Sequence, residues 1–238
     1  MPKKEKIIAL ASFIGVGLFV IGSVFYIYNK NINLQEKYNA DNLNFKDTQL
    51  GLLSEQPDDF TVGSSDPLVR LVVYTDTDCP FCARYEPRLQ QLLRNRPDDI
   101  SITYRNINLL RYPTSRFEQQ VLECVGKLTD SYTYVEFQSK YLLNRPSNEN
   151  DSNYVDLINA ASLFTERQLK TTADIRNCVE DQGTTDQLKR KQKIGRLLGV
   201  GGTPTTFLVS KDGGTKTITG SRTYEDLIQD IKNFETNF

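Results

Sequence analysis

The stretch Leu71-Val72-Val73-Tyr74-Thr75-Asp76-Thr77-Asp78-Cys79-Pro80-Phe81-Cys82 places two cysteines where a strand gives way to a helix. The apolar run before them has the length of a strand buried on both faces, and Ala83 continues a helix-like segment. If Cys79 caps that helix, its sulfur faces backbone N–H groups and the positive end of the helix dipole, and both lower the pKa of its thiol. Cys79 is then a nucleophile at neutral pH. Cys82, one helical turn further on, is the resolving thiol of a mixed disulfide.

Composition removes several competing functions. The chain of 238 residues contains no histidine, which excludes Ser-His and Cys-His catalysis and every histidine-containing metal site. Its 29 basic and 30 acidic residues leave no excess of positive charge for binding nucleic acid. A zinc site built on Cys79 and Cys82 needs further ligands, whereas the other two cysteines stand alone in separate helical segments. We therefore expect no metal and no organic cofactor.

The N-terminus predicts a membrane anchor. Residues 1–6 are short and basic, and residues 7–28 contain no charged side chain. A helix of this length, at about 1.5 Å per residue, crosses a hydrocarbon core of about 30 Å. The basic residues keep the N-terminus cytoplasmic, so the rest of the chain is expected on the extracytoplasmic face of the cell membrane. The polar residues 29–59 are interpreted as a tether.

From residue 60 the pattern is that of a globular α/β protein. Residues 60–108 contain a short edge strand, the buried strand with its following helix, and an alternating strand at Ile100–Ile107. Strand, helix and strand in this order predict a parallel crossover. Residues 109–198 carry helical periodicity, and residues 199–238 return to strands and a final helix. The expected helices of the middle part are 115–128, 132–143, 154–164, 172–182 and 185–198, with Thr184 as a cap and Gly183 as a stop.

The helix after Cys79 begins with Pro80, whose missing N–H costs nothing in the first turn. Apolar side chains recur at helical spacing and are expected to form its buried face: Phe81, Tyr85, Leu89, Leu92 and Leu93. Asp76 and Asp78 precede Cys79 and could raise its pKa or relay protons to Cys82. We interpret both as solvated loop carboxylates and leave them outside the predicted site.

A second motif, Gly199-Val200-Gly201-Gly202-Thr203-Pro204-Thr205, stands directly before a strand. By itself it is an ordinary glycine and proline loop. Together with the two cysteines, it predicts a Thr203-Pro204 bond close to the reactive sulfur. A cis peptide there would turn the backbone of Thr203 toward a bound client segment and offer it strand-like hydrogen bonds.

These two motifs, in this order and separated by helices, resemble the DsbA-like thiol:disulfide oxidoreductases, and the membrane-anchored members fit best. The resemblance covers residues 60–238 and includes the helical segment between the motifs. It implies a thioredoxin-like fold with an inserted helical domain. It also implies a nucleophile, a resolving thiol and a cis-proline with its preceding residue, which are here Cys79, Cys82, Pro204 and Thr203.

The resemblance has one departure, between the two cysteines. The strongest oxidants of the family carry Pro-His there, whereas this chain carries Pro80-Phe81. Phe81 can neither donate a hydrogen bond nor carry positive charge near the Cys79 thiolate, so one stabiliser of the reduced form is missing. We expect Pro80 and Phe81 to tune the site to a less oxidising potential than Pro-His would give.

Cys124 and Cys178 lie in two different helical segments beside apolar residues. They are either two inert core thiols or a structural disulfide. An even number of cysteines in an oxidising compartment favours the disulfide. The family resemblance agrees, because some members join these two helices.

These observations predict a membrane-tethered thiol:disulfide oxidoreductase that introduces disulfides into exported proteins. Its partners would be cysteine-containing clients and a membrane redox partner that reoxidises it. A reductase or isomerase supplied with electrons by a membrane donor is the alternative within the same chemistry. A chaperone or assembly factor that binds extended polypeptides at Thr203-Pro204, with incidental cysteines, is the alternative from another class.

Overall fold

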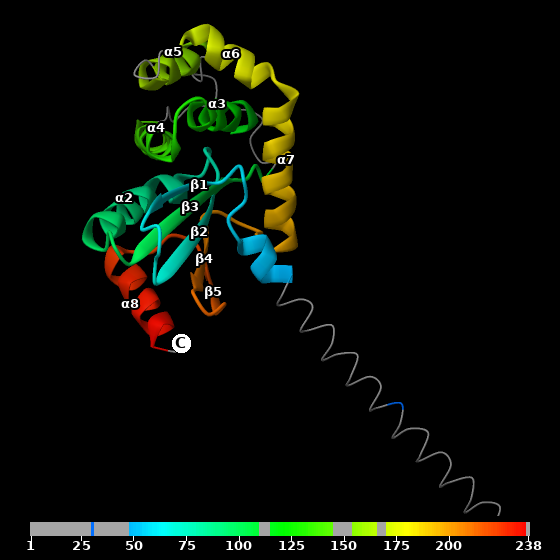
Figure 1. The fold of residues 1–238 in the computed structure, drawn as a ribbon. Coiled ribbons are helices and arrows are strands. Elements are labelled where there is room, and N and C mark those ends of the chain that lie inside the picture. The colour runs from blue at the N-terminus through cyan, green and yellow to red at the C-terminus, as the bar shows by residue number, and fades with distance from the viewer. Residues whose placement is uncertain (1–29, 31–47, 110–114, 145–153, 166–169, 237–238) are drawn as a thin grey trace, which may run out of the picture. The chain divides into compact units, whose positions relative to one another are not determined.

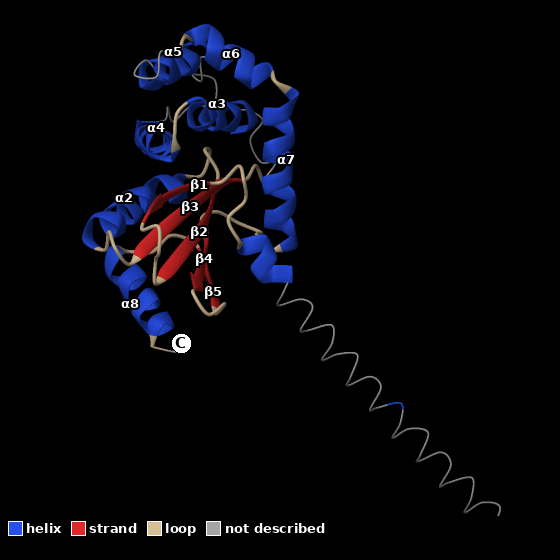
Figure 2. Cartoon of the chain, viewed as in Figure 1, coloured by secondary structure: helices blue, strands red, loops and turns tan. Residues whose placement is uncertain are grey.

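The computed structural model describes residues 30, 48–109, 115–144, 154–165 and 170–236. The chain divides into two units, residues 1–51 and 52–238. The second unit contains a five-stranded mixed sheet with helices packed around it (Figures 1 and 2).

The sheet has the strand order β1-β3-β2-β4-β5. Its strands are β1 (Phe60–Gly63), β2 (Val69–Thr75), β3 (Ile100–Asn106), β4 (Thr205–Ser210) and β5 (Thr215–Thr219). Strands β2 and β3 are parallel, and the other neighbouring pairs are antiparallel. Strand β2 lies in the middle of the sheet and is buried along almost its whole length, which explains its continuous apolar sequence.

The predicted parallel crossover is confirmed. Strand β2 pairs with β3 from Val69 opposite Ile100 to Thr75 opposite Asn106, and α2 (Pro80–Asn95) connects them. Helix α2 packs against β3 and against α8 (Tyr224–Glu235), and α8 also contacts β4. Alternate side chains of β2 point into the core beneath these helices: Val69, Leu71 and Val73.

The predicted helical insertion stands between β3 and β4. Its labelled helices are α3 (Ser115–Leu128), α4 (Ser131–Asn144), α5 (Tyr154–Thr165), α6 (Thr172–Glu180) and α7 (Gln182–Leu197). Helix α3 contacts all four of the others and is therefore the centre of the insertion. Helix α7 returns to the sheet and packs against β3 (Figure 1). The mixed α/β, thioredoxin-like arrangement agrees with the resemblance.

Helix α7 begins earlier than the sequence predicts. Thr184 is not its cap and Gly183 is not a stop, because both residues lie inside the helix. Asp181 is the N-cap, since its carboxylate accepts the backbone N–H of Thr184 at 3.1 Å. Asp181 is also the C-cap of α6, so one residue separates the two helices.

The globular unit also begins before the predicted boundary. Residues 52–59 of the predicted tether belong to it, and Leu53 is fully buried. The reason is Arg105 in β3, whose buried guanidinium binds the Asp59 carboxylate at 2.6 Å and the carbonyl oxygen of Leu52 at 2.7 Å. The polar composition of residues 52–59 predicts a tether, whereas one of these polar residues, Asp59, belongs to a buried ion pair.

The predicted anchor, residues 7–28, lies outside the described residues, as do residues 1–6. Both therefore stay predictions. Among the residues that the structure describes, no helix has the length and apolar character needed to span a membrane.

We expect Arg105→Met to lower the free energy of unfolding by about 3 kcal/mol or more, because it leaves the Asp59 carboxylate buried without its partner. Both side chains of this pair are fully buried. Arg190→Met is the matched control, since Arg190 binds Asp58 at 2.6 Å but is half exposed, and its loss should cost less than about 1 kcal/mol. Urea unfolding measures both values. Equal losses would contradict a special role for the buried pair.

Candidate active site

Cys79 is the N-cap of α2, as the sequence predicts. Its backbone is extended, with φ −88° and ψ 111°, and its sulfur accepts the backbone N–H of Cys82 at 3.4 Å. Pro80 occupies the first position of the helix. Because the first N–H groups of a helix lack carbonyl partners, the sulfur of Cys79 lies at the positive end of the α2 dipole.

The second predicted motif lies against this sulfur. The Thr203-Pro204 peptide bond is cis, and the Cys79 thiol, when it is protonated, donates to the carbonyl oxygen of Thr203 at 3.1 Å. Strand β4 begins directly afterwards at Thr205, whose hydroxyl donates to the carbonyl of Gly202 at 2.7 Å and holds the loop. The structure thus brings the two motifs together across 124 residues of sequence.

The two thiols have opposite environments. Cys79 is partly exposed, whereas Cys82 is only 3% exposed. A hydrogen bond with the Cys82 thiol is the main cause that lowers the pKa of Cys79 to about 6, and the backbone N–H groups of Phe81 and Cys82 act in the same direction. Burial raises the pKa of Cys82 far above its ordinary value, and the neighbouring Cys79 raises it further. At neutral pH, Cys79 is therefore the thiolate and Cys82 the thiol.

Phe81 faces solvent, and its predicted place on the buried face of α2 is wrong. Its side chain is 51% exposed. Cys82 occupies the buried position in this first turn, and successive residues of a helix differ by about 100° in direction. The guanidinium carbon of Arg84 lies 4.6 Å from the centre of the Phe81 ring. The buried residues of α2 are Cys82, Tyr85, Glu86, Leu89 and Leu92.

The sequence as a whole matches a known family. A family model described as Thioredoxin matches residues 55–233, which is most of the globular unit. The chain belongs to the thioredoxin family. Among curated proteins, no sequence matches this one.

Solved structures of the thioredoxin family show which form of the fold is present. The catalytic domain of Proteus mirabilis ScsC matches with a TM-score of 0.64 at 18% identity, over 81% of this chain and 98% of that one. A variant of alpha-DsbA1 from Wolbachia pipientis matches with 0.65 at 16% identity, over 79% and 96%. DsbA2 from Pseudomonas aeruginosa matches with 0.60 at 18% identity, over 75% and 95%. The fold is that of the DsbA-like members.

The two carboxylates that precede Cys79 are buried, although the sequence indicates solvated loop residues. Asp76 is 4% exposed and Asp78 is 6% exposed. Asp76 accepts hydrogen bonds from the Ser115 hydroxyl at 2.8 Å and from the Gln119 amide at 3.3 Å, both on α3. It therefore fastens the loop before Cys79 to the first helix of the insertion. The partners lie about 40 residues away in sequence, so no local pattern points to them.

Cys124 and Cys178 are joined in the structure by a disulfide with an S–S distance of 2.10 Å. The bond connects α3 to α6, and Cys124 is fully buried in the main core. Closing a loop of 54 residues stabilises a fold by about 4 kcal/mol in the chain-entropy model. This pair is thus part of the scaffold of the insertion and separate from the Cys79 site.

Glu86 is a buried titratable group that the sequence analysis missed. Its side chain is 2% exposed and accepts hydrogen bonds from Gln90 at 2.9 Å and Tyr104 at 3.4 Å. Burial raises the pKa of its carboxyl to about 7. The sequence feature that points to a buried Glu86 is its position four residues after Cys82. Positions i and i+4 of a helix share a face, and Cys82 is buried.

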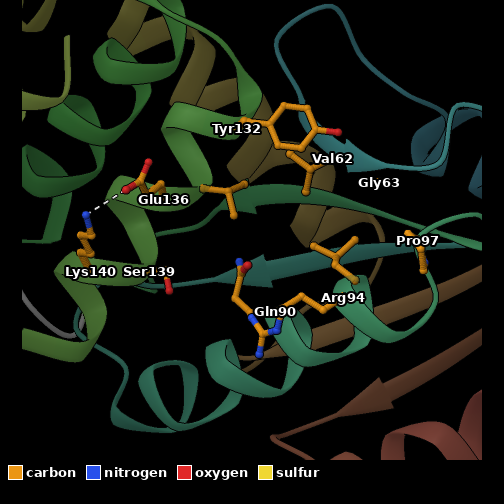
Figure 3. A pocket seen from close by; sticks show the side chains of 11 residues that line it. Val62, Gly63, Gln90, Arg94, Pro97, Tyr132, Glu136, Ser139 and Lys140 are labelled. Carbon is orange, nitrogen blue, oxygen red and sulfur yellow. Dashed lines mark hydrogen bonds and ion pairs between the residues drawn. The ribbon is translucent and has the colours of Figure 1, made fainter. Parts of the chain in front are cut away.

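A pocket of about 630 Å³ lies between α2, α4 and β1 (Figure 3). Glu136 and Lys140 of α4, which form an ion pair at 2.8 Å, stand on one side of it. The lining residues are Val62, Gly63, Gln90, Leu93, Arg94, Pro97, Tyr132, Val135, Glu136, Ser139 and Lys140. Neither redox cysteine is among them, so we assign this pocket no part in the thiol chemistry.

We expect alkylation of the reduced protein by iodoacetamide to follow one ionisation with a midpoint near pH 6, because the Cys79 thiolate is the reacting species. Cys82→Ala removes the main cause of the lowered pKa, so the midpoint should rise toward the ordinary thiol value of about 8.5. Mass spectrometry of samples quenched at each pH gives the rates. A midpoint that stays near pH 6 in Cys82→Ala would contradict the part assigned to the Cys82 thiol.

Proposed function

We propose that the protein is an extracytoplasmic thiol:disulfide oxidoreductase that introduces disulfides into exported proteins. The observation that carries this proposal is the difference between the two thiols, with the pKa of Cys79 lowered and that of Cys82 raised. A stabilised Cys79 thiolate favours the reduced pair over its disulfide, and this makes the disulfide form an oxidant. The thioredoxin family and the DsbA-like fold support the same chemistry.

The reaction begins with Cys79 and Cys82 joined as a disulfide. A client thiolate attacks the Cys79 sulfur, the bond to Cys82 breaks, and the Cys82 sulfur takes the electron pair and a proton. A second client thiolate then attacks the client sulfur of this mixed disulfide, and Cys79 leaves as the stabilised thiolate. The client loses two electrons, which the cysteine pair gains. Of the two client protons, one ends on Cys82 and the other goes to solvent.

The burial of Cys82 supports oxidation as the favoured direction. A thiol with a raised pKa stays protonated and attacks a mixed disulfide slowly. The second cysteine of the client therefore has time to complete its own disulfide. Where a client has no second cysteine, Cys82 is the resolving thiol that releases it.

The backbone of the loop at Thr203-Pro204, directly before β4, is proposed to bind the client. The carbonyl of Thr203 lies 3.1 Å from the Cys79 sulfur, so a client segment extended along this backbone would have its own sulfur beside Cys79. Pro80 and Phe81 are exposed next to the same sulfur and are proposed to tune its potential. Electrons pass only between sulfur atoms, so the reaction requires neither a metal nor an organic cofactor, and we assign reoxidation to a membrane redox partner.

The oxidised protein should form one disulfide per molecule in a reduced, unfolded client such as ribonuclease A. Cys79→Ser should abolish this, and Cys82→Ser should accumulate a mixed disulfide that is visible on a non-reducing gel. The reduction potential against glutathione should lie nearer about −120 mV than about −270 mV. A value near the lower figure would favour the reductase instead. Client binding that survives in Cys79→Ser, without any turnover in the native protein, would favour the chaperone.

The catalytic unit is proposed to be tethered to the outer face of the cell membrane through residues 7–28. The uncharged character of this segment is the observation behind the proposal. The full chain should stay in the membrane pellet during alkaline carbonate extraction, whereas a chain lacking residues 1–28 should be released. Protease added from outside to cells whose cell membrane is intact, but whose outer layers have been made permeable, should degrade the catalytic unit. Release of the full chain by carbonate would refute the anchor.

A further inference from the structure

Phe81 and Arg84 form an exposed pair beside the redox cysteines. Phe81 lies between Cys79 and Cys82 in the sequence, and its ring is exposed to solvent. Arg84 is exposed as well. The guanidinium carbon of Arg84 lies 4.6 Å from the ring centre, within the range of a cation–π interaction. The contact with the Phe81 ring therefore holds the positive charge of Arg84 beside the Pro80-Phe81 dipeptide, which separates the two cysteines.

This charge is unfavourable for the helix that carries it. Arg84 lies in the second turn of α2, near the positive end of its dipole, and the first turn contains no acidic residue. Arg88 adds a like charge four residues further on, and its guanidinium donates to the carbonyl of Arg84. In the part of the chain that the structure describes, the arginine ion pairs involve other arginines than these two. Residues that are unfavourable for their own helix, and that no other contact in the fold compensates, are typical of functional positions.

The Cys79 thiolate does not account for the charge of Arg84. The groups that lower the pKa of Cys79 are the Cys82 thiol, Thr203 and backbone N–H groups at the start of α2. They do not depend on the side chain at position 84. Since Arg84 has no ion pair with the residues that the structure describes, its positive charge can pair with an acidic group of a client bound at Cys79.

We propose that the Phe81–Arg84 pair selects clients that carry an acidic side chain close to the cysteine being oxidised. A guanidinium binds a carboxylate through two parallel hydrogen bonds. The ring restricts the guanidinium before the client arrives, so less side-chain freedom is lost on binding. An acidic client residue thus supplies the ion pair that α2 leaves open. The inference rests on the proposed function, because it concerns the substrate of the same site.

The test compares two client peptides that are identical except for one residue next to the first of two cysteines, which is Glu in one and Lys in the other. Each is oxidised by the full chain, in its disulfide form, in a non-ionic detergent. Each rate is divided by the same peptide's rate with the neutral reagent 2-hydroxyethyl disulfide, because the neighbouring charge also changes the pKa of the peptide thiol. Dithiothreitol, which is uncharged, reports the basic redox activity.

The native protein should oxidise the Glu peptide about threefold to fivefold faster than the Lys peptide after this correction, as expected for an exposed ion pair. The preference should fall as salt is added. Arg84→Gln should remove it and Arg84→Glu should reverse it, while the rate with dithiothreitol stays the same. Arg176→Gln is the matched control, because Arg176 is an exposed arginine on α6 and its loss changes the net charge equally. It should keep the full preference.

Equal corrected rates for the two peptides, with normal oxidation of dithiothreitol, would overturn this inference and leave the proposed function intact. A preference that survives in Arg84→Gln, or disappears equally in Arg176→Gln, would also overturn it. No oxidation of either peptide or of dithiothreitol would overturn the proposed function, and the inference with it. Phe81→Ala separates the two members of the pair, since it should weaken the preference while the charge remains.

Discussion

The antiparallel register of β2 and β4 places both halves of the redox site at one edge of the sheet. Tyr74, near the end of β2, lies opposite Thr205 at the start of β4. Cys79 follows β2 and Thr203 precedes β4, so their contact follows from strand pairing despite a separation of 124 positions in sequence. The parallel partner β3 requires a crossover, and that crossover supplies the helix start at Cys79. The insertion leaves this geometry intact because it enters after β3 and returns before β4.

Local patterns predicted the features that depend on neighbours in sequence. The strand-to-helix junction indicated Cys79 as a cap with a lowered pKa, since both effects come from the first turn of α2. Burial of polar side chains was not predictable in this way, because Asp76 and Arg105 owe it to distant partners. The helical spacing of apolar side chains predicts a buried Phe81, whereas its ring is exposed. Periodicity does not decide which of two adjacent apolar residues faces the sheet, and here Cys82 does.

Buried polar contacts fix the helices of the insertion to one another and to the sheet. Glu123 of α3 binds Lys191 of α7 at 2.8 Å, with both side chains almost completely buried. At the end of β3, Asn106 donates to the hydroxyl of Tyr134 on α4 at 2.8 Å. Hydrogen bonds have preferred directions, so such contacts favour one docking arrangement where an apolar interface would tolerate several. Through Asp76, this fixed insertion also steadies the loop that leads into Cys79.

The disulfide between Cys124 and Cys178 joins a thiol position that the fold hides to one that it leaves partly accessible. Cys124 has no exposed surface, whereas Cys178 is only partly buried, so an oxidant can react with the thiol of Cys178, and the Cys124 thiol then completes the bond from inside the core. Each mature chain has thus itself been oxidised at Cys124 and Cys178. Burial of Cys124 protects its half of the bond from thiols in solution. One chain thus holds two cysteine pairs, each with one buried and one partly accessible sulfur, and only the Cys79–Cys82 pair is reduced in the structure.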